Sequence, residues 1–413
     1  IGSIGCALSS SVMHFVIARI LQGMGGAMMT PVGRLVLLRT IDKSALVNAM
    51  TWVTVPALIG PVVGPPLGGF ITTYLSWHWI FLINIPIGLL GIFMAMKFID
   101  PIKSIDPERF DLYGLVLAGI GLGGIAFGLS VAGLNLLPWS VVAALVGVGS
   151  VSMTLYVIHA RRTGSPVLDF SLLRLSTMRA AILGGFLFRL GIGALPFLLP
   201  LLMQVGFGLS PFQSGLVTFS SAIGAMGMKT LAARIIRTFG FRNMMTANAV
   251  ISAFFLGACA LFTVTTPLLL IMIILVVGGF FRSLEFTAIN TVAYAEIEPA
   301  QMSRATTLVS VNQQLALSTG VAVGAASVET TLWLHHQTEL SAGVFAPAFL
   351  VVALISATSS WFFWQMPDDA GHEISGRKAI AISSRKGAAR EAAQEATVVA
   401  TEETQDARDQ RLG

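Results

Sequence analysis

The sequence has very little charge. Asp, Glu, Lys and Arg make up 11% of its 413 residues, whereas hydrophobic residues make up 55%. Soluble globular chains carry about 25% charged residues, so this composition excludes a soluble multidomain protein. The formal net charge of +5 does not indicate a nucleic-acid partner, because the basic residues lie in short connections between apolar runs. We predict an all-α polytopic membrane protein surrounded by lipid bilayer.

Residue patterns typical of enzymes and metal sites are also missing. The two cysteines, Cys6 and Cys259, lie in separate apolar runs and form neither a disulfide framework nor a metal-binding spacing. The sequence has no His-Glu-x-x-His motif, and the residues Gly128-Leu129-Ser130 have no histidine placed to act as a base. We therefore predict no catalytic residues, no metal and no cofactor.

Apolar runs of about 20 residues predict membrane-spanning helices. By this rule we predict eleven spans: 14–35, 47–72, 79–98, 112–133, 138–158, 180–203, 213–233, 244–265, 268–290, 303–326 and 344–365. The run before His14 is too short to cross a bilayer, and it has neither an initiating Met nor the basic start of a signal peptide. We expect an N-terminally truncated chain.

The connections between these spans divide sharply by charge. One alternating set contains no Lys or Arg: 9–13, 73–78, 134–137, 204–212, 266–267 and 327–343. The Lys and Arg residues of the connections all lie in the other set. Basic connections stay on the cytoplasmic side of a membrane. We predict a multi-pass protein with a cytoplasmic C-terminus, ending in a polar tail over residues 367–413.

Four charged residues lie deep inside predicted spans: Arg19, Arg189, Arg282 and Glu285. A charge at mid-bilayer costs about 2.5–3.5 kcal/mol on insertion scales. Arg282 and Glu285 are three residues apart on one helix, so they could form a structural ion pair, or instead line a proton or substrate pathway. Uncharged polar residues recur in or beside the spans, and we expect most to hydrogen bond between helices. They are Gln22, Asn84, Gln204, Asn290, Asn312, Gln313 and Gln314.

The second predicted span contains glycines at four-residue spacing with prolines between them. The residues are Gly60, Pro61, Gly64, Pro65, Gly68 and Gly69. Glycines on one helix face allow close helix contact, whereas each proline removes a backbone hydrogen bond and bends the helix. This pattern predicts a kinked helix at a tightly packed rocking interface.

Several motifs together resemble the major facilitator superfamily, in its fourteen-span drug/proton antiporter branch of the EmrB and QacA type. Residues 19–27 (Arg-Ile-Leu-Gln-Gly-Met-Gly-Gly-Ala) match the fourth-helix motif of that branch, residues 60–69 its antiporter motif, and residues 77–86 (Trp-His-Trp-Ile-Phe-Leu-Ile-Asn-Ile-Pro) the start of its sixth helix. Further matches, such as residues 204–208 and 286–290, resemble bacterial MdtD-like and HsrA-like transporters. The resemblance covers almost the whole chain.

The resemblance implies a major facilitator fold of two helix bundles with two extra linking helices, without the first two helices and part of the third. The implied organisation is an N-terminal bundle remnant (1–110), two linking helices (111–160), a C-terminal six-helix bundle (161–366) and the tail. It also implies a monomer in the bacterial cytoplasmic (inner) membrane that exports small molecules in exchange for protons by alternating access. The candidate pathway residues are Arg19, Gln22, Arg189, Arg282, Glu285 and Asn290.

Other functions stay open at this point. Three membrane arginines against one glutamate suit an anionic substrate, so an exporter of organic anions such as citrate or iron-citrate is the main alternative. A channel or a non-transporting membrane sensor is a further alternative.

Overall fold

The computed structural model describes residues 1–40, 60, 63–64, 66–99, 111–132, 137–164, 166–298, 301–336, 340–368 and 370–371. In this part of the chain every regular element is a helix, as the composition predicts. The N-terminal helices are α1 (Gly2–Ala7), α2 (Val12–Thr40), α4 (Trp79–Leu82), α5 (Asn84–Phe98), α6 (Leu112–Ala132) and α7 (Trp139–Ala160); residues 66–74 are also helical.

The C-terminal helices follow a short 3-10 turn, η1 (Phe170–Arg174). They are α8 (Ser176–Arg179), η2 (Ala180–Gly184), α9 (Gly185–Leu201), η3 (Leu202–Gly206), α10 (Pro211–Phe239), α11 (Phe241–Ala258), η4 (Cys259–Leu261), α12 (Leu268–Val292), α13 (Met302–Leu334) and α14 (Ala342–Trp364). The segments from α8 to η3 form one long run, Ser176–Gly206, in which η2 and η3 are π-helical.

Local sequence signals set several of these boundaries. The Ser210 hydroxyl accepts a hydrogen bond from the backbone N–H of Gln213, and the Gln213 side-chain oxygen accepts one from the backbone N–H of Ser210. Pro211 is the first residue of α10. This reciprocal pair is a capping box. Only Gly240 separates α10 from α11, and its φ of 76° is a left-handed conformation that favours glycine.

The helices confirm the predicted polytopic membrane fold. Nine helical segments of the described residues are long and apolar enough to cross a membrane, and the apolar stretch Leu112–Gly128 of α6 is a shorter tenth. The predicted span 47–72 lies largely outside the described residues. The other ten predicted spans each coincide with a helix, although α13 extends beyond the predicted 303–326 to Leu334.

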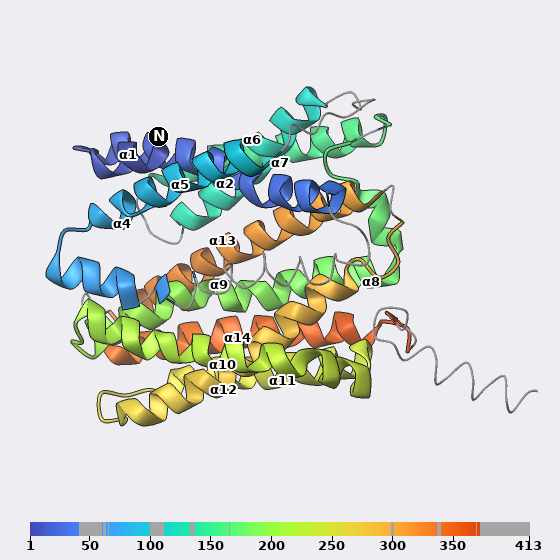
Figure 1. The fold of residues 1–413 in the computed structure, drawn as a ribbon. Helices are drawn as coiled ribbons and strands as arrows, with labels where there is room; N and C mark the ends of the chain where they lie inside the picture. The colour runs from blue at the N-terminus through green and yellow to red at the C-terminus, as the bar shows by residue number, and fades with distance from the viewer. Residues whose placement is uncertain are drawn as a thin grey trace, which may run out of the picture.

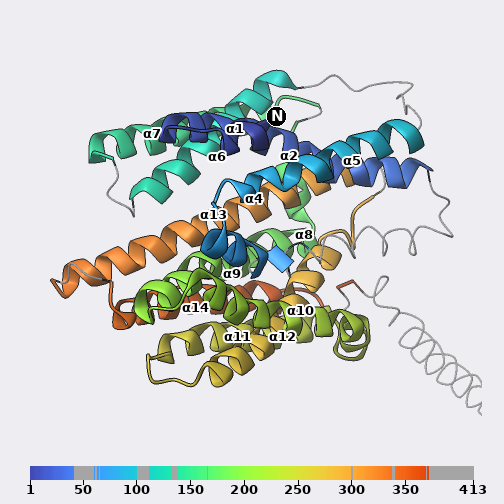
Figure 2. The ribbon, with the colours of Figure 1, turned by 60° about the vertical axis from the view of Figure 1, so that its left-hand side comes forward.

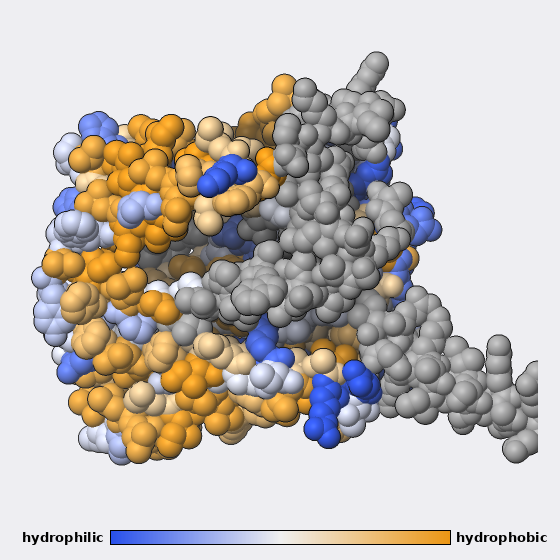
Figure 3. Space-filling view, in the orientation of Figure 1, coloured by the Kyte–Doolittle hydropathy of each residue, from blue (hydrophilic) through white to orange (hydrophobic). Residues whose placement is uncertain are grey.

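The helices lie side by side in two groups (Figures 1 and 2). Helices α1, α2 and α4–α7 form one group, and α9–α12 with α14 form the other, while α13 crosses obliquely between them. Apolar residues cover most of the described surface that is visible in Figure 3, on both groups. This surface suits contact with lipid chains.

Glycines bring helices of the C-terminal bundle into backbone contact. A Cβ atom on Gly224 of α10 would overlap the carbonyl oxygen of Val276 on α12, and one on Gly279 would overlap that of Ser221. Gly193 and Gly320 make the same kind of approach between α9 and α13. Small residues at such crossings allow close van der Waals packing where no hydrophobic effect drives association.

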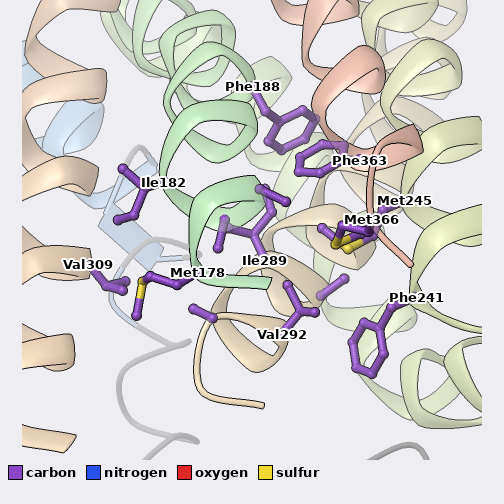
Figure 4. Close-up of a cluster of buried hydrophobic side chains, with 14 of the residues drawn as sticks. Met178, Ile182, Phe188, Phe241, Met245, Ile289, Val292, Val309, Phe363 and Met366 are labelled. Carbon is purple, nitrogen blue, oxygen red and sulfur yellow. The ribbon is translucent and has the colours of Figure 1, made fainter. Parts of the chain in front are cut away.

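The core of this bundle is apolar at the end that carries the α10–α11 connection. Side chains from α8, α9, α11, α12, α13 and α14 meet there (Figure 4). Among them are Met178, Phe188, Met245, Ile289 and Phe363, each at most 1% exposed. Just beyond α14, Arg242 of α11 bonds to the Trp364 carbonyl and the Asp368 carboxylate, which holds the start of the C-terminal segment against this end.

The helix pair α6 and α7 attaches to the C-terminal bundle. Helix α6 packs on α13, and the Tyr156 hydroxyl of α7 bonds to both the amide and the carbonyl of Leu168, just before η1. At the same end of the pair, His159 Nε2 lies 2.8 Å from Asp111 Oδ1. Burial alone raises the pKa of Asp111, but hydrogen bonds from the Gly114 amide and His159 outweigh it, so the pKa lies below its ordinary value.

Candidate functional site

Arg189 and Asn290, predicted separately as pathway residues, lie together at the contact between α9 and α12. Nη2 of Arg189 donates to Oδ1 of Asn290 over 3.0 Å. Asn290 Nδ2 in turn donates to the Phe286 carbonyl of its own helix, which fixes the orientation of the amide. The guanidinium carbon lies 5.5 Å from the centre of the Phe286 ring, a cation–π contact.

Arg189 is entirely enclosed yet incompletely bonded. It is 0% exposed, and neither Nε nor Nη1 has a hydrogen-bond partner in the part of the chain that the structure describes. The π-helical segment η2 ends one residue before Gly185, and a Cβ at Gly185 would lie 3.2 Å from Nη1 of Arg189. Such π segments within α-helices occur frequently at functional sites.

Arg282 and Glu285 do not form the ion pair that their spacing suggests. Arg282 on α12 donates instead to the Ser221 hydroxyl on α10. Glu285 accepts from Nδ2 of Asn248 on α11 at 2.8 Å. Residues three apart on an α-helix diverge by about 60° around its axis. Because α12 contacts α10 as well as α11, that divergence turns the two charges toward different neighbours, and the expectation of a pair is wrong.

Glu285 is the most deeply buried acid in the described residues, at 0% exposure. One carboxyl oxygen is held by Asn248, which also donates to the Phe281 carbonyl at 2.9 Å. Neither the other oxygen, Oε1, nor Asn248 Oδ1 accepts a hydrogen bond from any described residue. A proton on the carboxyl group would supply a donor here, so this pair has the composition of a proton-binding site.

Asn248 is the residue that sequence reasoning missed. A polar amide within the predicted span 244–265 was the available signal. The other predicted amides vary in what they contact. Asn312 on α13 donates to the Ile182 carbonyl of η2, and Gln204 reaches Ser214 on α10, whereas Asn84 bonds within its own helix segment.

Arg19 and Gln22 lie together on α2, apart from the other candidates. The Arg19 guanidinium donates to Gln22 Oε1 at 3.1 Å and lies over the rings of Phe15 and Phe81. Gln22 also donates to Ser3 on α1. Arg19 remains exposed in the described structure. Its charge is therefore balanced by aromatic faces and one amide.

The glycine-rich segment contacts the C-terminal bundle at one of its predicted positions. A Cβ on Gly69 would lie 2.6 Å from the Pro211 carbonyl oxygen at the start of α10, and the rings of Phe70 and Tyr74 contact Phe212. Gly60, Gly64 and Gly68 have no atoms of the described residues this close. Pro61 and Pro65 lie outside the described residues. The close interface predicted for this motif is thus found at Gly69.

The chemistry available at these sites is binding, hydrogen bonding and proton exchange. Within the residues that the structure describes, no group of three His, Cys, Asp or Glu side chains could hold a metal ion. The polar groups of the C-terminal bundle instead join helices in pairs: α9 with α12, α10 with α12, and α11 with α12. Helix α12 is common to all three contacts.

Comparison with known proteins gives the family. The model of the family described as "Major Facilitator Superfamily" matches residues 1–112 and 181–401. A protein named "Putative multidrug resistance protein MdtD" from Salmonella heidelberg (strain SL476) is 35% identical over 393 residues, which are 94% of this chain and 81% of the relative. Its namesake from Escherichia coli (strain 55989 / EAEC) is 35% identical over 398 residues, 94% of this chain and 82% of the relative. The chain is therefore an MdtD-like membrane transporter that belongs to the Major Facilitator Superfamily.

Proposed function

We propose that this transporter exports small molecules, including drugs, from the bacterial cytoplasm in exchange for protons. The observation that carries the proton coupling is the Glu285–Asn248 pair, a fully enclosed carboxyl group beside an amide with one acceptor free on each side. A buried membrane carboxyl group is a functional-site hypothesis by default. The names of the relatives support drugs as the substrate class.

In this proposal the two bundles alternate access to a site between them. Residues 1–110 and 161–366 supply the bundles, and 111–160 supply two linking helices. The gap in the family match, between residues 112 and 181, falls on α6 and α7 and supports this division. The basic connections and the polar tail lie in the cytoplasm, the protein works as a monomer, and the proton gradient takes the place of any cofactor.

Arg19, Gln22, Arg189, Arg282 and Asn290 join Glu285 as candidate pathway residues. Arg19 stays charged at any working pH, so it acts by biasing a nearby carboxyl group rather than by carrying the proton. Contact of Gly69 with Pro211 supports a role for the glycine-rich segment where the halves meet.

The test uses the complete gene product in everted membrane vesicles with an acid interior. Lipophilic cations, neutral drugs and organic anions are added in turn, and the proton gradient is followed with a fluorescent dye. Loss of the gradient on adding one compound, absent from vector-only vesicles, is the expected result. If folded protein responds to none of them, proton antiport is wrong.

A matched pair of variants tests the carrier. Glu285→Gln preserves the size of the side chain but cannot exchange a proton, so we expect it to lose gradient-coupled transport. Glu296→Gln is the control, because Glu296 is exposed and accepts a hydrogen bond from the half-buried Ser176 outside the buried helix contacts. Unchanged transport and pH dependence in Glu285→Gln would exclude Glu285 as the proton carrier.

A further inference from the structure

Arg189 differs from the other cations of the membrane helices because two of its nitrogens have no hydrogen-bond acceptor among the described residues. Arg282 bonds to Ser221, Lys229 bonds to Thr287, and Arg19 lies exposed beside Gln22 and two rings. Arg189 is 0% exposed and has one amide oxygen as its hydrogen-bond acceptor. Nε and Nη1, which together carry three N–H donors, have no acceptor among the described residues.

Nothing in the described helices neutralises this charge. The deepest acid, Glu285, is held by Asn248 on α11, and no described carboxylate makes an ion pair with Arg189. A guanidinium group remains protonated at any physiological pH, and an enclosed charge without a counter-ion is strongly unfavourable. The fold therefore maintains a cationic group whose anionic partner is not part of the described structure.

The surroundings of Arg189 hold the group in a defined orientation. Asn290 accepts from Nη2, and its amide is fixed by its bond to the Phe286 carbonyl. The Phe286 ring lies 5.5 Å from the guanidinium carbon, and the missing side chain of Gly185 leaves Nη1 uncovered by a Cβ. A planar guanidinium held in one place by an amide and a ring is preorganised for bidentate binding of a carboxylate or phosphate group.

We propose that Arg189, oriented by Asn290, binds an oxyanion group of the transported solute, so that the substrates of this site carry a carboxylate or phosphate. The inference rests on the proposed transport function and names its substrate class. Because Arg189 is enclosed here, the solute reaches it only when α9 and α12 move apart within the C-terminal bundle, a change that adds to the rocking of the two bundles. Phospholipid headgroups offer the same chemistry, so the test must distinguish the two sources.

The binding test uses the purified full chain in nanodiscs of neutral phosphatidylcholine. Unfolding temperature is measured with benzoate, succinate or phosphate against chloride at equal ionic strength. We expect at least one oxyanion to stabilise the wild type, and Arg189→Gln to weaken its apparent affinity about 10- to 100-fold, as loss of a charged hydrogen bond implies. Arg189→Lys should retain part of the effect, and Lys229→Gln, which removes a cation that has a partner, should retain all of it.

Three results would overturn the inference. These are no stabilisation of the wild type by any of the three oxyanions, equal stabilisation of Arg189→Gln, and stabilisation that depends on Arg189 only when anionic phosphatidylglycerol replaces the neutral lipid. The last result would assign Arg189 to a lipid headgroup. Chromatographic homogeneity of Arg189→Gln, together with its unfolding temperature without added anion, shows whether the variant folds.

Vesicle transport separates this inference from the proposed function. If wild-type vesicles exchange protons for cationic or neutral compounds but never for oxyanions, the antiporter stands and the assignment of Arg189 fails. If oxyanions stabilise the protein through Arg189 but no compound dissipates the gradient, the binding site stands and proton antiport fails.

Discussion

Arginines and glycines have different surroundings in the N-terminal helices and in the C-terminal bundle. Only 6% of the residues of Val12–Met29 are buried, against 61% in an apolar 18-residue window of Ser176–Gly206. Arg19, in the first region, lies over two aromatic rings and needs no enclosed partner. Arg189, in the second, is enclosed and depends on a single amide. Burial thus makes each polar contact specific, because an enclosed group that loses its partner cannot turn to water or lipid headgroups.

Glycines show the same contrast. Among the described residues, nothing lies within 4 Å of a Cβ added to Gly60, Gly64 or Gly68, whereas Gly224 and Gly279 leave no room for one. Other N-terminal glycines, such as Gly124 and Gly149, do pack closely, but a small residue at those three positions is not required by the packing that the structure describes. In the second region it decides how closely α10 and α12 approach.

The largest expected effect is a loss of stability when a close glycine contact of the C-terminal bundle is removed. Gly224→Val places side-chain atoms against the Val276 carbonyl of α12, so the helices must separate or the protein must unfold. We expect a loss of about 3 kcal/mol or more of stability, measured as thermal unfolding in detergent. Gly64→Val is the matched control and should change stability by less than about 0.5 kcal/mol. Equal effects of the two substitutions would contradict the contrast.

A smaller loss of stability is expected at the polar contact of α11 with α12. Asn248→Leu removes the donor to Glu285 and to the Phe281 carbonyl. The Phe281 carbonyl keeps its bond within α12, but the enclosed Glu285 carboxyl group loses its one side-chain donor among the described residues. The expected cost is about 2 kcal/mol. The double variant Asn248→Leu with Glu285→Leu should recover part of it, because both polar groups are then gone. Unfolding measurements on the single and double variants decide this, and strictly additive losses would argue against a direct contact.

Gly69 offers a further test of this comparison, because it lies where the N-terminal helices contact the C-terminal bundle. Gly69→Val introduces atoms 2.6 Å or less from the Pro211 carbonyl, which prevents the close approach of this segment to α10. We expect a stability change of about 1 kcal/mol but a clear loss of transport in the vesicle assay. Transport equal to that of Gly68→Val, whose added Cβ meets no neighbour, would show that this contact has no part in the cycle.

The smallest expected effect concerns the helix pair α6 and α7. Because the pKa of Asp111 is lowered in the folded protein, its carboxylate stabilises the fold above its unfolded pKa of about 3.9 and loses this effect as pH falls through the lower folded value. Asp111→Asn should therefore cost about 0.5 kcal/mol near pH 6, and this cost should shrink as the pH falls below about 3.9. An unfolding series across this range tests the sign. A penalty that grows in acid would contradict it.

Much of the fold could be predicted from hydropathy alone, because a bilayer imposes both helix and length on an apolar run. The predicted span 79–98 coincides with the helical segment Trp79–Phe98. Helix α13 was predicted too short, since the polar residues around Glu329 lower the hydropathy before the helix ends at Leu334. Spacing placed Arg282 and Glu285 near each other on α12 but could not show which neighbouring helix each faces.

The candidate site was predictable as a set of residues but not as contacts. Arg189 and Asn290 are 101 residues apart, and their pairing is a consequence of how α9 crosses α12. Asn248 was missed although other span amides, such as Asn312, were singled out, because nothing in the local sequence shows that this residue faces Glu285. Such pairings depend on tertiary packing, which one sequence does not encode in any local pattern.

The attachment of α6 to α13, and of Tyr156 to the Leu168 backbone, has a mechanical consequence. If the two bundles rock as proposed above, these contacts make α6 and α7 move together with the C-terminal bundle as one body. The moving unit would then contact, and displace, more lipid than a six-helix bundle alone. The speed of its turnover should therefore respond to the viscosity of the bilayer.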